Sequence, residues 1–168
     1  MALSIIVAHD KNYGIGFENN IPWYIQEDFN WFKRHTTAKM VVMGTKTYFS
    51  LEDKYRPLPN RENYVLCNES EYYEQIKNEG AKFFTTFDDV LEFAKNKDVF
   101  IIGGASIYKQ FIDYADYLYI TKIDKEFKCD TFFPKVNYDE WNHVYKSENI
   151  EIDDYSYTFN FYGKNKNE

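Results

Sequence analysis

Asp28 is the side chain whose position most directly suggests chemistry, because a carboxylate there interrupts an apolar pattern. The i, i+3, i+4 and i+7 positions of one predicted helix face hold Ile25, Asp28, Phe29 and Phe32. Burial disfavours a charged carboxylate unless a partner compensates it. A flat heterocycle with a ring N–H beside an exocyclic amine would pair with both oxygens of Asp28. In the alternative interpretation, Asp28 only stabilises the first helical turn through the dipole, and the spacing leaves both open.

Two strand–glycine–helix junctions carry a second chemical pattern. They are Val41-Val42-Met43-Gly44-Thr45-Lys46-Thr47 and Phe100-Ile101-Ile102-Gly103-Gly104-Ala105-Ser106. Backbone N–H groups at a helix N-terminus suit phosphate binding when little side chain obstructs them. Two such junctions on one sheet could hold the two ends of a dinucleotide, although neither matches G-x-G-x-x-G or the P-loop. The alternative is that glycine is simply the easiest residue for a strand-to-helix turn.

A loop at residues 12–23 and a turn at residues 56–61 complete the candidate site. The loop combines glycines and asparagines with a terminal Pro22-Trp23. This composition predicts either a lid over a ligand or a surface loop anchored by a buried tryptophan. The turn has an arginine on each side of a proline-rich segment, where Arg56 and Arg61 would either grip a carboxylate or stay solvated.

Strand-like and helix-like segments alternate along the chain and must position these residues. Apolar runs predict strands at 3–8, 39–43, 63–66, 82–85, 99–102 and 117–123. Helices are predicted at 25–36, 45–51, 71–79, 87–96 and 105–112. Two more strands, at 141–148 and 155–162, follow without a helix between them. The predicted fold class is therefore α/β, with a mostly parallel central sheet, helices on both faces and an antiparallel C-terminal edge.

The predicted sheet also indicates where the functional site should lie. Open α/β sheets bind ligands beyond the carboxyl ends of their strands, so the site is expected just after Ala8, Met43 and Ile102. The length of 168 residues predicts one domain over residues 1–163 with a polar tail at 164–168.

Composition narrows the class of protein. The formal net charge of −7 argues against nucleic acid or an anionic membrane as the main partner. The N-terminal segment has no signal-peptide pattern, so a cytosolic protein is expected. The two cysteines form no CxxC pair and the three histidines are scattered, so we expect no metal site and no covalent hydrolase arrangement.

Taken together, these segments resemble the dihydrofolate reductase family. The blocks that match, in the family's order and approximate spacing, are Ile15-Gly16, Ile21-Pro22-Trp23, Asp28-Phe29, Trp31-Phe32-Lys33, Val42 to Thr47, Arg56 to Arg61, Ile102 to Tyr108 and Asp130 to Pro134. Each block is weak alone, but the set is specific. The resemblance implies an NADPH-dependent enzyme that transfers hydride to C6 of dihydrofolate, with protonation at N5, giving tetrahydrofolate. It also implies a monomer that binds antifolates.

The resemblance further implies a role for each matching residue. Asp28 would bind the pterin with support from Thr121, and Trp23 would complete the catalytic group. The other substrate contacts would come from Ile6, Phe29, Phe32, Lys33, Leu51, Arg56, Leu58, Arg61, Ile102 and Tyr108. The cofactor would be held by Ala8, Ile15, Gly16, Gly44, Thr45, Lys46, Thr47, Leu66, Cys67, Asn68, Gly103, Gly104, Ala105, Ser106 and Ile107. Arg61 would clamp the glutamate α-carboxylate, and the Gly103–Gly104 peptide bond is expected to be cis.

Two departures from the family pattern have consequences. Thr45 stands where many members carry a basic residue for the cofactor 2′-phosphate, and Asn68 and Ser106 are also neutral. We therefore expect a weaker preference for NADPH, so that NADH could also serve. Cys129 stands where glycine is frequent, which predicts a stiffer loop beside the lid. Two alternative classes stay open: a non-catalytic folate- or nucleotide-binding relative, and a reductase of pteridine or riboflavin-precursor chemistry.

Overall fold

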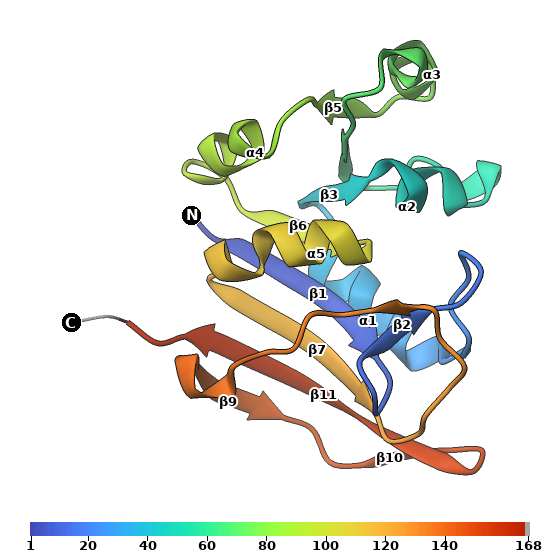
Figure 1. Cartoon of the computed structure of the whole chain (residues 1–168), viewed down its shortest axis with the longest axis vertical. Coiled ribbons are helices and arrows are strands. Elements are labelled where there is room, and N and C mark those ends of the chain that lie inside the picture. The colour runs from blue at the N-terminus through green and yellow to red at the C-terminus, as the bar shows by residue number, and fades with distance from the viewer. Residues whose placement is uncertain (167–168) are drawn as a thin grey trace.

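The computed structural model describes residues 1–166 and arranges them around one large sheet (Figure 1). Within these residues the sheet has nine strands in the order β10-β11-β7-β1-β6-β3-β4-β5, with β9 also paired to β11. The strands are β1 (Leu3–His9), β3 (Met40–Gly44), β4 (Glu62–Leu66), β5 (Lys82–Phe84), β6 (Val99–Gly103), β7 (Tyr117–Ile123), β9 (Trp141–Lys146), β10 (Ile150–Ile152) and β11 (Tyr155–Lys164). The short strands β2 (Gly14–Gly16) and β8 (Thr131–Phe132) form a separate pair.

Helices occupy most of the connections between the parallel strands. The α-helices are α1 (Gln26–Thr36), α2 (Thr45–Ser50), α3 (Tyr73–Asn78), α4 (Phe87–Ala94) and α5 (Ala105–Phe111). Short 3-10 turns are η1 (Asp53–Tyr55), η2 (Ser70–Tyr72), η3 (Ile112–Tyr114) and η4 (Tyr138–Glu140). None of the helices in residues 1–166 combines the length and the apolar character that a membrane crossing requires.

The pairing of the strands confirms the predicted fold class. All neighbours from β7 through β1, β6, β3 and β4 to β5 are parallel. The C-terminal strand β11 runs antiparallel to β7 on one side and to β9 and β10 on the other. Parallel strands have their carboxyl ends at one edge, so β1, β3 and β6 deliver the expected site residues to the same side of the sheet.

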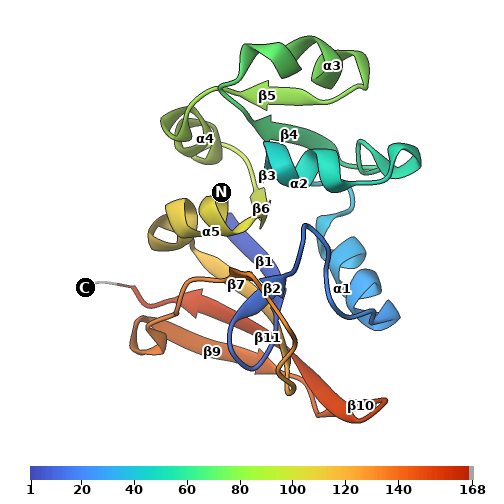
Figure 2. The same ribbon diagram turned by 45° about the vertical axis from the view of Figure 1, so that its right-hand side comes forward.

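Alternation along the strands divides the core into two layers. On β1, the side chains of Ile5 and Val7 join the cluster that contains Phe111 of α5, while Ile6 joins the cluster that contains Trp31 of α1. Figures 1 and 2 accordingly show α1 and α5 on opposite sides of the sheet. Both faces are thus covered, which explains why the central strands are continuous apolar runs.

Three local predictions need correction. The strands β2, β8 and β10 were not predicted, because two or three residues carry too weak a pattern. They owe their conformation to pairing, β2 with β8 and β10 with β11. The segment predicted as one helix at 71–79 begins as the turn η2 before continuing as α3. The first residue of the predicted tail, Lys164, belongs to β11 and pairs with Glu140 at 3.0 Å. The end of that tail, 167–168, lies outside the described residues.

Candidate active site

Asp28 meets the sheet at the carboxyl ends of β1 and β7. Its Oδ1 accepts a hydrogen bond of 2.6 Å from the hydroxyl of Thr121, a residue that is 1% exposed on β7. Thr121 is paired in register with Ala8 of β1, so the helix brings the carboxylate directly to the edge that the fold predicts. The predicted support of Asp28 by Thr121 is thus a direct contact.

The surroundings of Asp28 perturb its ionisation. Loss of water around the half-buried side chain raises the pKa of Asp28 from 3.8 to about 6, and the hydrogen bond from Thr121 opposes this rise. A carboxyl group poised near neutral pH in this way is typical of a functional site. The dipole interpretation of Asp28 does not account for its contact with β7.

Backbone groups from β1 and β6 border the same region. The hydroxyl of Tyr108 is buried and donates a 2.8 Å hydrogen bond to the carbonyl oxygen of Ile6. A Cβ atom placed on Gly103 would lie 3.4 Å from this hydroxyl. Ile102, the residue before that glycine, is partly exposed at the end of β6. Tyr108 therefore orients the Ile6 carbonyl and connects the Asp28 region to the glycine pair.

The two strand–glycine–helix junctions lie side by side. Met43 at the end of β3 pairs with Gly103 at the end of β6, and the Gly103–Gly104 peptide bond is cis as expected. A Cβ atom on Gly104 would approach Thr47 Oγ1 to 3.3 Å, and one on Gly44 would lie 2.9 Å from Ile107 Cγ1. Glycine therefore permits this close packing of the two junctions. The first-turn N–H groups of α2 and α5 follow directly after them, which fits the phosphates of a dinucleotide.

The other predicted cofactor-binding residues differ in their exposure to solvent. Thr45, Thr47 and Leu66 are half-buried, and Lys46, Asn68 and Ser106 are exposed. Cys67 is only 2% exposed, and its side chain packs with Val65 and Ile76 in the core. Its place near the adenosine stays a prediction, and any contact there would come from the Cys67 backbone because the side chain fills the interior.

The two arginines of the proline-rich turn have different interaction partners. Arg61 donates to the carbonyl of Pro59 at 2.9 Å and to Thr36 Oγ1 at 3.1 Å, and it lies over the ring of Phe32. These contacts orient the guanidinium, while neither partner neutralises its charge. Burial lowers the pKa of Arg61 without removing that charge at neutral pH.

Arg56 is committed to a structural ion pair instead. Its Nε and Nη2 donate to the carboxylate of Glu79 at 3.0 and 2.8 Å, and Tyr48 donates to the same carboxylate at 2.7 Å. The hydrogen bonds from Arg56 hold the pKa of Glu79 at about 2. This ion pair argues against a direct contact between Arg56 and a substrate carboxylate, while its place near the Arg61 clamp stays a prediction. Glu79 was not recognised in the sequence, because nothing local marks it as the partner of an arginine 23 residues away.

The apolar face of α1 is divided between the core and the site. Trp31 is the buried side chain, stacked on Phe159 with ring centroids 4.5 Å apart. Phe29 of the predicted apolar face is 45% exposed, so it does not contribute to the core. Phe32, Leu51 and Leu58 pack against the Trp31 cluster but stay partly exposed, and Lys33 is exposed. The exposed ring of Phe29 is thus available to a ligand near Asp28.

The predicted lid loop is tied down at several points. Trp23 is buried and packs on Phe127 with centroids 5.3 Å apart, as expected of an anchor. Ile15 and Gly16 lie in β2, which pairs with β8. Asp130, just before β8, accepts a 3.0 Å hydrogen bond from the backbone N–H of Glu18.

Asp10 is a site-supporting residue that sequence analysis missed. The side chain is 1% exposed and accepts from the backbone N–H groups of Asn12, Gly14 and Phe127 at 2.9, 2.7 and 2.8 Å. One carboxylate therefore joins the lid loop to the segment after β7. The run His-Asp-Lys-Asn at the end of β1 was a weak signal, because aspartate commonly caps its own turn.

The fold and the site define a class: an α/β protein that binds a pterin-like ring and a dinucleotide across the carboxyl edge of a parallel sheet. A family model described as dihydrofolate reductase matches residues 2–164. The dihydrofolate reductase of Haemophilus influenzae is 38% identical over 156 residues, covering 92% of this chain and 88% of that protein. The enzyme of the same name from Buchnera aphidicola is 37% identical over 163 residues, covering 95% and 97%.

Comparison with solved structures gives the same family as the sequence comparisons. The dihydrofolate reductase from Enterococcus faecalis, complexed with NADP(H) and RAB-propyl, superposes with a TM-score of 0.86 at 30% identity. The match covers 98% of this chain and 97% of that one. The chain belongs to the dihydrofolate reductase family, which confirms the resemblance seen in the sequence.

The close packing of Gly14 against Cys129 gives a stability prediction. A Cβ atom on Gly14 would lie 2.7 Å from Cys129 Cβ and closer still to its sulfur. Gly14→Ala should therefore lower the free energy of unfolding by about 1–3 kcal/mol, as overpacking does. The double variant Gly14→Ala, Cys129→Gly should recover more than half of the loss, since it removes the clash.

Urea denaturation of the four proteins in this cycle measures the effect. Gly163→Ala is the matched control, because a Cβ atom there meets no atom closer than 3.7 Å. Additive losses in the double variant would show that Gly14 and Cys129 do not share one space.

Proposed function

We propose that this chain reduces dihydrofolate to tetrahydrofolate with NADPH, using Asp28 as its single ionisable contact with the pterin. The observation that carries the proposal is the desolvated Asp28 carboxylate, held by Thr121 beside the Ile6 carbonyl and the Gly103–Gly104 turn. Full-length similarity to dihydrofolate reductases supports the same activity. When bound, NADPH supplies the hydride that is transferred to C6 of the substrate.

Asp28 binds and polarises the pterin in this scheme. Its two oxygens suit the ring N–H and the exocyclic amine of the pterin, as a carboxylate suits an amidine-like fork. Because its pKa of about 6 is close to neutral pH, the carboxyl group is matched to proton chemistry on the ring. Water reaches N5 as the lid loop moves, and Trp23 anchors the C-terminal end of that loop.

The remaining residues position the two ligands. Phe29, Phe32, Leu51 and Leu58 line the path from Asp28 toward Arg61, which takes the glutamate carboxylate with Lys33 nearby. Ala8, Ile15 and Gly16 border the nicotinamide position. The junction residues Gly44, Thr45, Lys46, Thr47 and Gly103 to Ile107, with Leu66 and Asn68, hold the rest of the dinucleotide. A monomeric state and a cytosolic location stay predictions from the sequence.

Asp28→Asn tests the central assignment. Turnover of dihydrofolate near neutral pH, followed by NADPH oxidation with and without methotrexate, should fall by about 10²–10⁴-fold. The free energy of unfolding, in contrast to turnover, should rise in this variant. Folding raises the pKa of Asp28, so the folded state binds more protons between pH 3.8 and about 6, and wild-type stability falls as the pH rises through that window.

The variant lacks this titration. Asp28→Asn should therefore be more stable than the wild type above pH 6, with the difference shrinking as the pH approaches 4. Asp113→Asn, an exposed position in η3, is the control and should change neither quantity. Undiminished turnover by Asp28→Asn would refute the proposed role.

Arg61→Ala tests the substrate clamp. Loss of a charge-assisted contact of about 1.5–3 kcal/mol should raise the KM for dihydrofolate by about 10- to 100-fold with little change in kcat. A pterin substrate without the glutamate should be affected much less. Arg34→Ala, at an exposed position on α1, is the control in the same steady-state assay. An equal loss on both substrates would place Arg61 elsewhere in the mechanism.

Thr45→Arg tests the selection of the cofactor. An arginine at the first position of α2 would pair with the 2′-phosphate, which only NADPH carries. The ratio of kcat/KM for NADPH to that for NADH should rise about tenfold or more. Ser50→Arg adds the same charge at the far end of α2 and should leave the ratio unchanged. The idea fails if both substitutions raise the ratio equally.

A further inference from the structure

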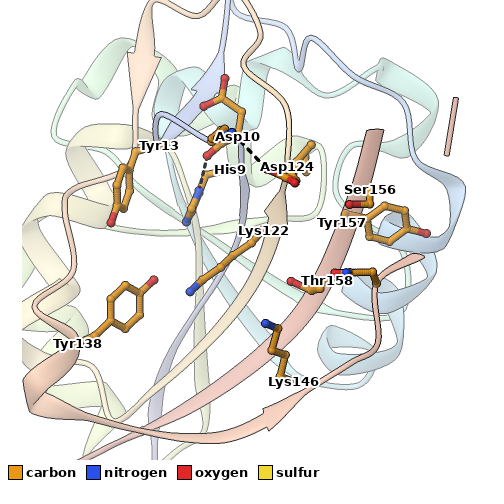
Figure 3. Close-up of a pocket in the computed structure, with 13 residues that line it drawn as sticks. His9, Asp10, Tyr13, Lys122, Asp124, Tyr138, Lys146, Ser156, Tyr157 and Thr158 are labelled. Carbon is orange, nitrogen blue, oxygen red and sulfur yellow. Dashed lines mark hydrogen bonds and ion pairs between the residues drawn. The ribbon is translucent and has the colours of Figure 1, made fainter. Parts of the chain in front are cut away.

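A pocket lies on the face of the sheet opposite to Asp28. Its volume is about 330 Å³, at the lower end of the range for small-molecule sites. The residues that matter for its chemistry are His9, Lys122, Tyr138, Lys146 and Thr158, shown in Figure 3. Thr121 and Lys122 are consecutive on β7, so their side chains point to opposite faces, one to Asp28 and one to this β7–β11 pocket.

His9 presents an unused hydrogen-bond acceptor to the pocket. The residue is 6% exposed, and its Nδ1 lies 2.8 Å from the carbonyl oxygen of Asp10. A carbonyl only accepts, so Nδ1 carries the proton and Nε2 of the neutral ring is an acceptor. Burial lowers the pKa of His9, and the Lys122 ammonium acts in the same direction. The hydrogen bond to the Asp10 carbonyl opposes this shift, but the net pKa is lowered, which favours the neutral ring. Nε2 is buried and has no partner among residues 1–166.

Hydrogen-bond donors face the same space. Nζ of Lys122 donates to Tyr162 Oη at 2.6 Å and makes no other hydrogen bond among residues 1–166, although an ammonium has three N–H groups. The same Nζ lies 4.3 Å from the centre of the Tyr138 ring. The Tyr138 hydroxyl is buried beside the Tyr162 hydroxyl, and among residues 1–166 it makes no hydrogen bond of good geometry. Figure 3 shows the His9, Lys122 and Tyr138 side chains pointing toward one another. Buried polar atoms are usually paired, so this cluster calls for a ligand.

The charge of the pocket is positive. Neither Lys122 nor Lys146 belongs to an ion pair within residues 1–166. Burial lowers the pKa of Lys122, and so does the charge of Lys146. The two acidic residues that line the pocket have other partners: Asp124 lies 3.7 Å from Lys11, and the buried Asp10 accepts from three backbone N–H groups. An anion would therefore relieve the repulsion between the two lysines.

We propose that the β7–β11 pocket binds a small oxyanion that keeps a proton at neutral pH, with hydrogen phosphate as the model ligand. Its charged oxygens accept hydrogen bonds from Lys122 and Tyr138, and its negative charge compensates Lys146. Its hydroxyl group donates to Nε2 of His9. Sulfate has the same shape but no hydroxyl group at neutral pH, so it leaves Nε2 unsatisfied. This site is separate from the folate site and does not depend on the proposed activity.

An NMR titration of the cofactor-saturated protein tests the proposal. Saturation with NADPH fills the phosphate-binding junctions, and the histidine ring resonances are followed as sodium phosphate is added at constant ionic strength. We expect a saturable shift at His9, no comparable shift at His35 of α1, and at least fivefold weaker binding of sulfate. Lys122→Gln should weaken phosphate binding at least tenfold, whereas Lys135→Gln, an exposed lysine outside the pocket, should not.

Several outcomes would overturn the proposal of an oxyanion site. Equal affinity for phosphate and sulfate would show that His9 takes no part. Unsaturable shifts, or shifts unchanged by Lys122→Gln, would show that phosphate does not bind in the pocket. If Lys122→Gln does not fold, Lys146→Gln replaces it with an expected loss of at least threefold. NADPH oxidation with dihydrofolate is measured on the same samples, so a failure of the proposed activity is recognised separately.

Discussion

The strand β1 is hydrogen-bonded to β6 on one side and to β7 on the other, and the site depends on that parallel arrangement. The register places Ile5 beside Ile101 and Ala8 beside Thr121. Parallel pairing sends the carboxyl ends of all three strands to one edge, and the pleat sends successive side chains to opposite faces. Thr121 can therefore hold Asp28 on one face while His9 and Lys122 meet on the other. A slip of one residue would exchange these two sets.

The carboxylate of Asp28 shows how function is obtained at a cost in stability. Removal of water raises its pKa, and the Thr121 hydroxyl offsets only part of that effect. A folded protein optimised for stability alone would place an amide or an apolar group at this position. The same desolvation strengthens the interaction with a cationic or N–H-rich ring, which explains why a charge is retained there.

The loops beside the site are positioned by contacts between distant segments. The Asp10 carboxylate holds both the lid loop and the chain after β7, and Asp130 adds a second tie to the lid. Gly14 and Cys129 occupy one shared space, so the unusual cysteine is matched by a residue without a side chain. The predicted stiffer loop stays a prediction, but this packing gives it a structural basis.

The sequence by itself determined the fold class, the five α-helices, eight of the eleven described strands and the family, because hydrophobic periodicity and glycine junctions depend on neighbours in the chain. It also marked Asp28, Thr121, Arg61 and the cis Gly103–Gly104 bond through the resemblance. Only the tertiary structure decided that Arg56 belongs to Glu79, that Cys67 is interior, that Phe29 is exposed and that His9 borders a second pocket. Each of these outcomes is a choice of partner among segments far apart in sequence. Burial and the register of the sheet determine such partners, and a local sequence pattern does not predict either of them.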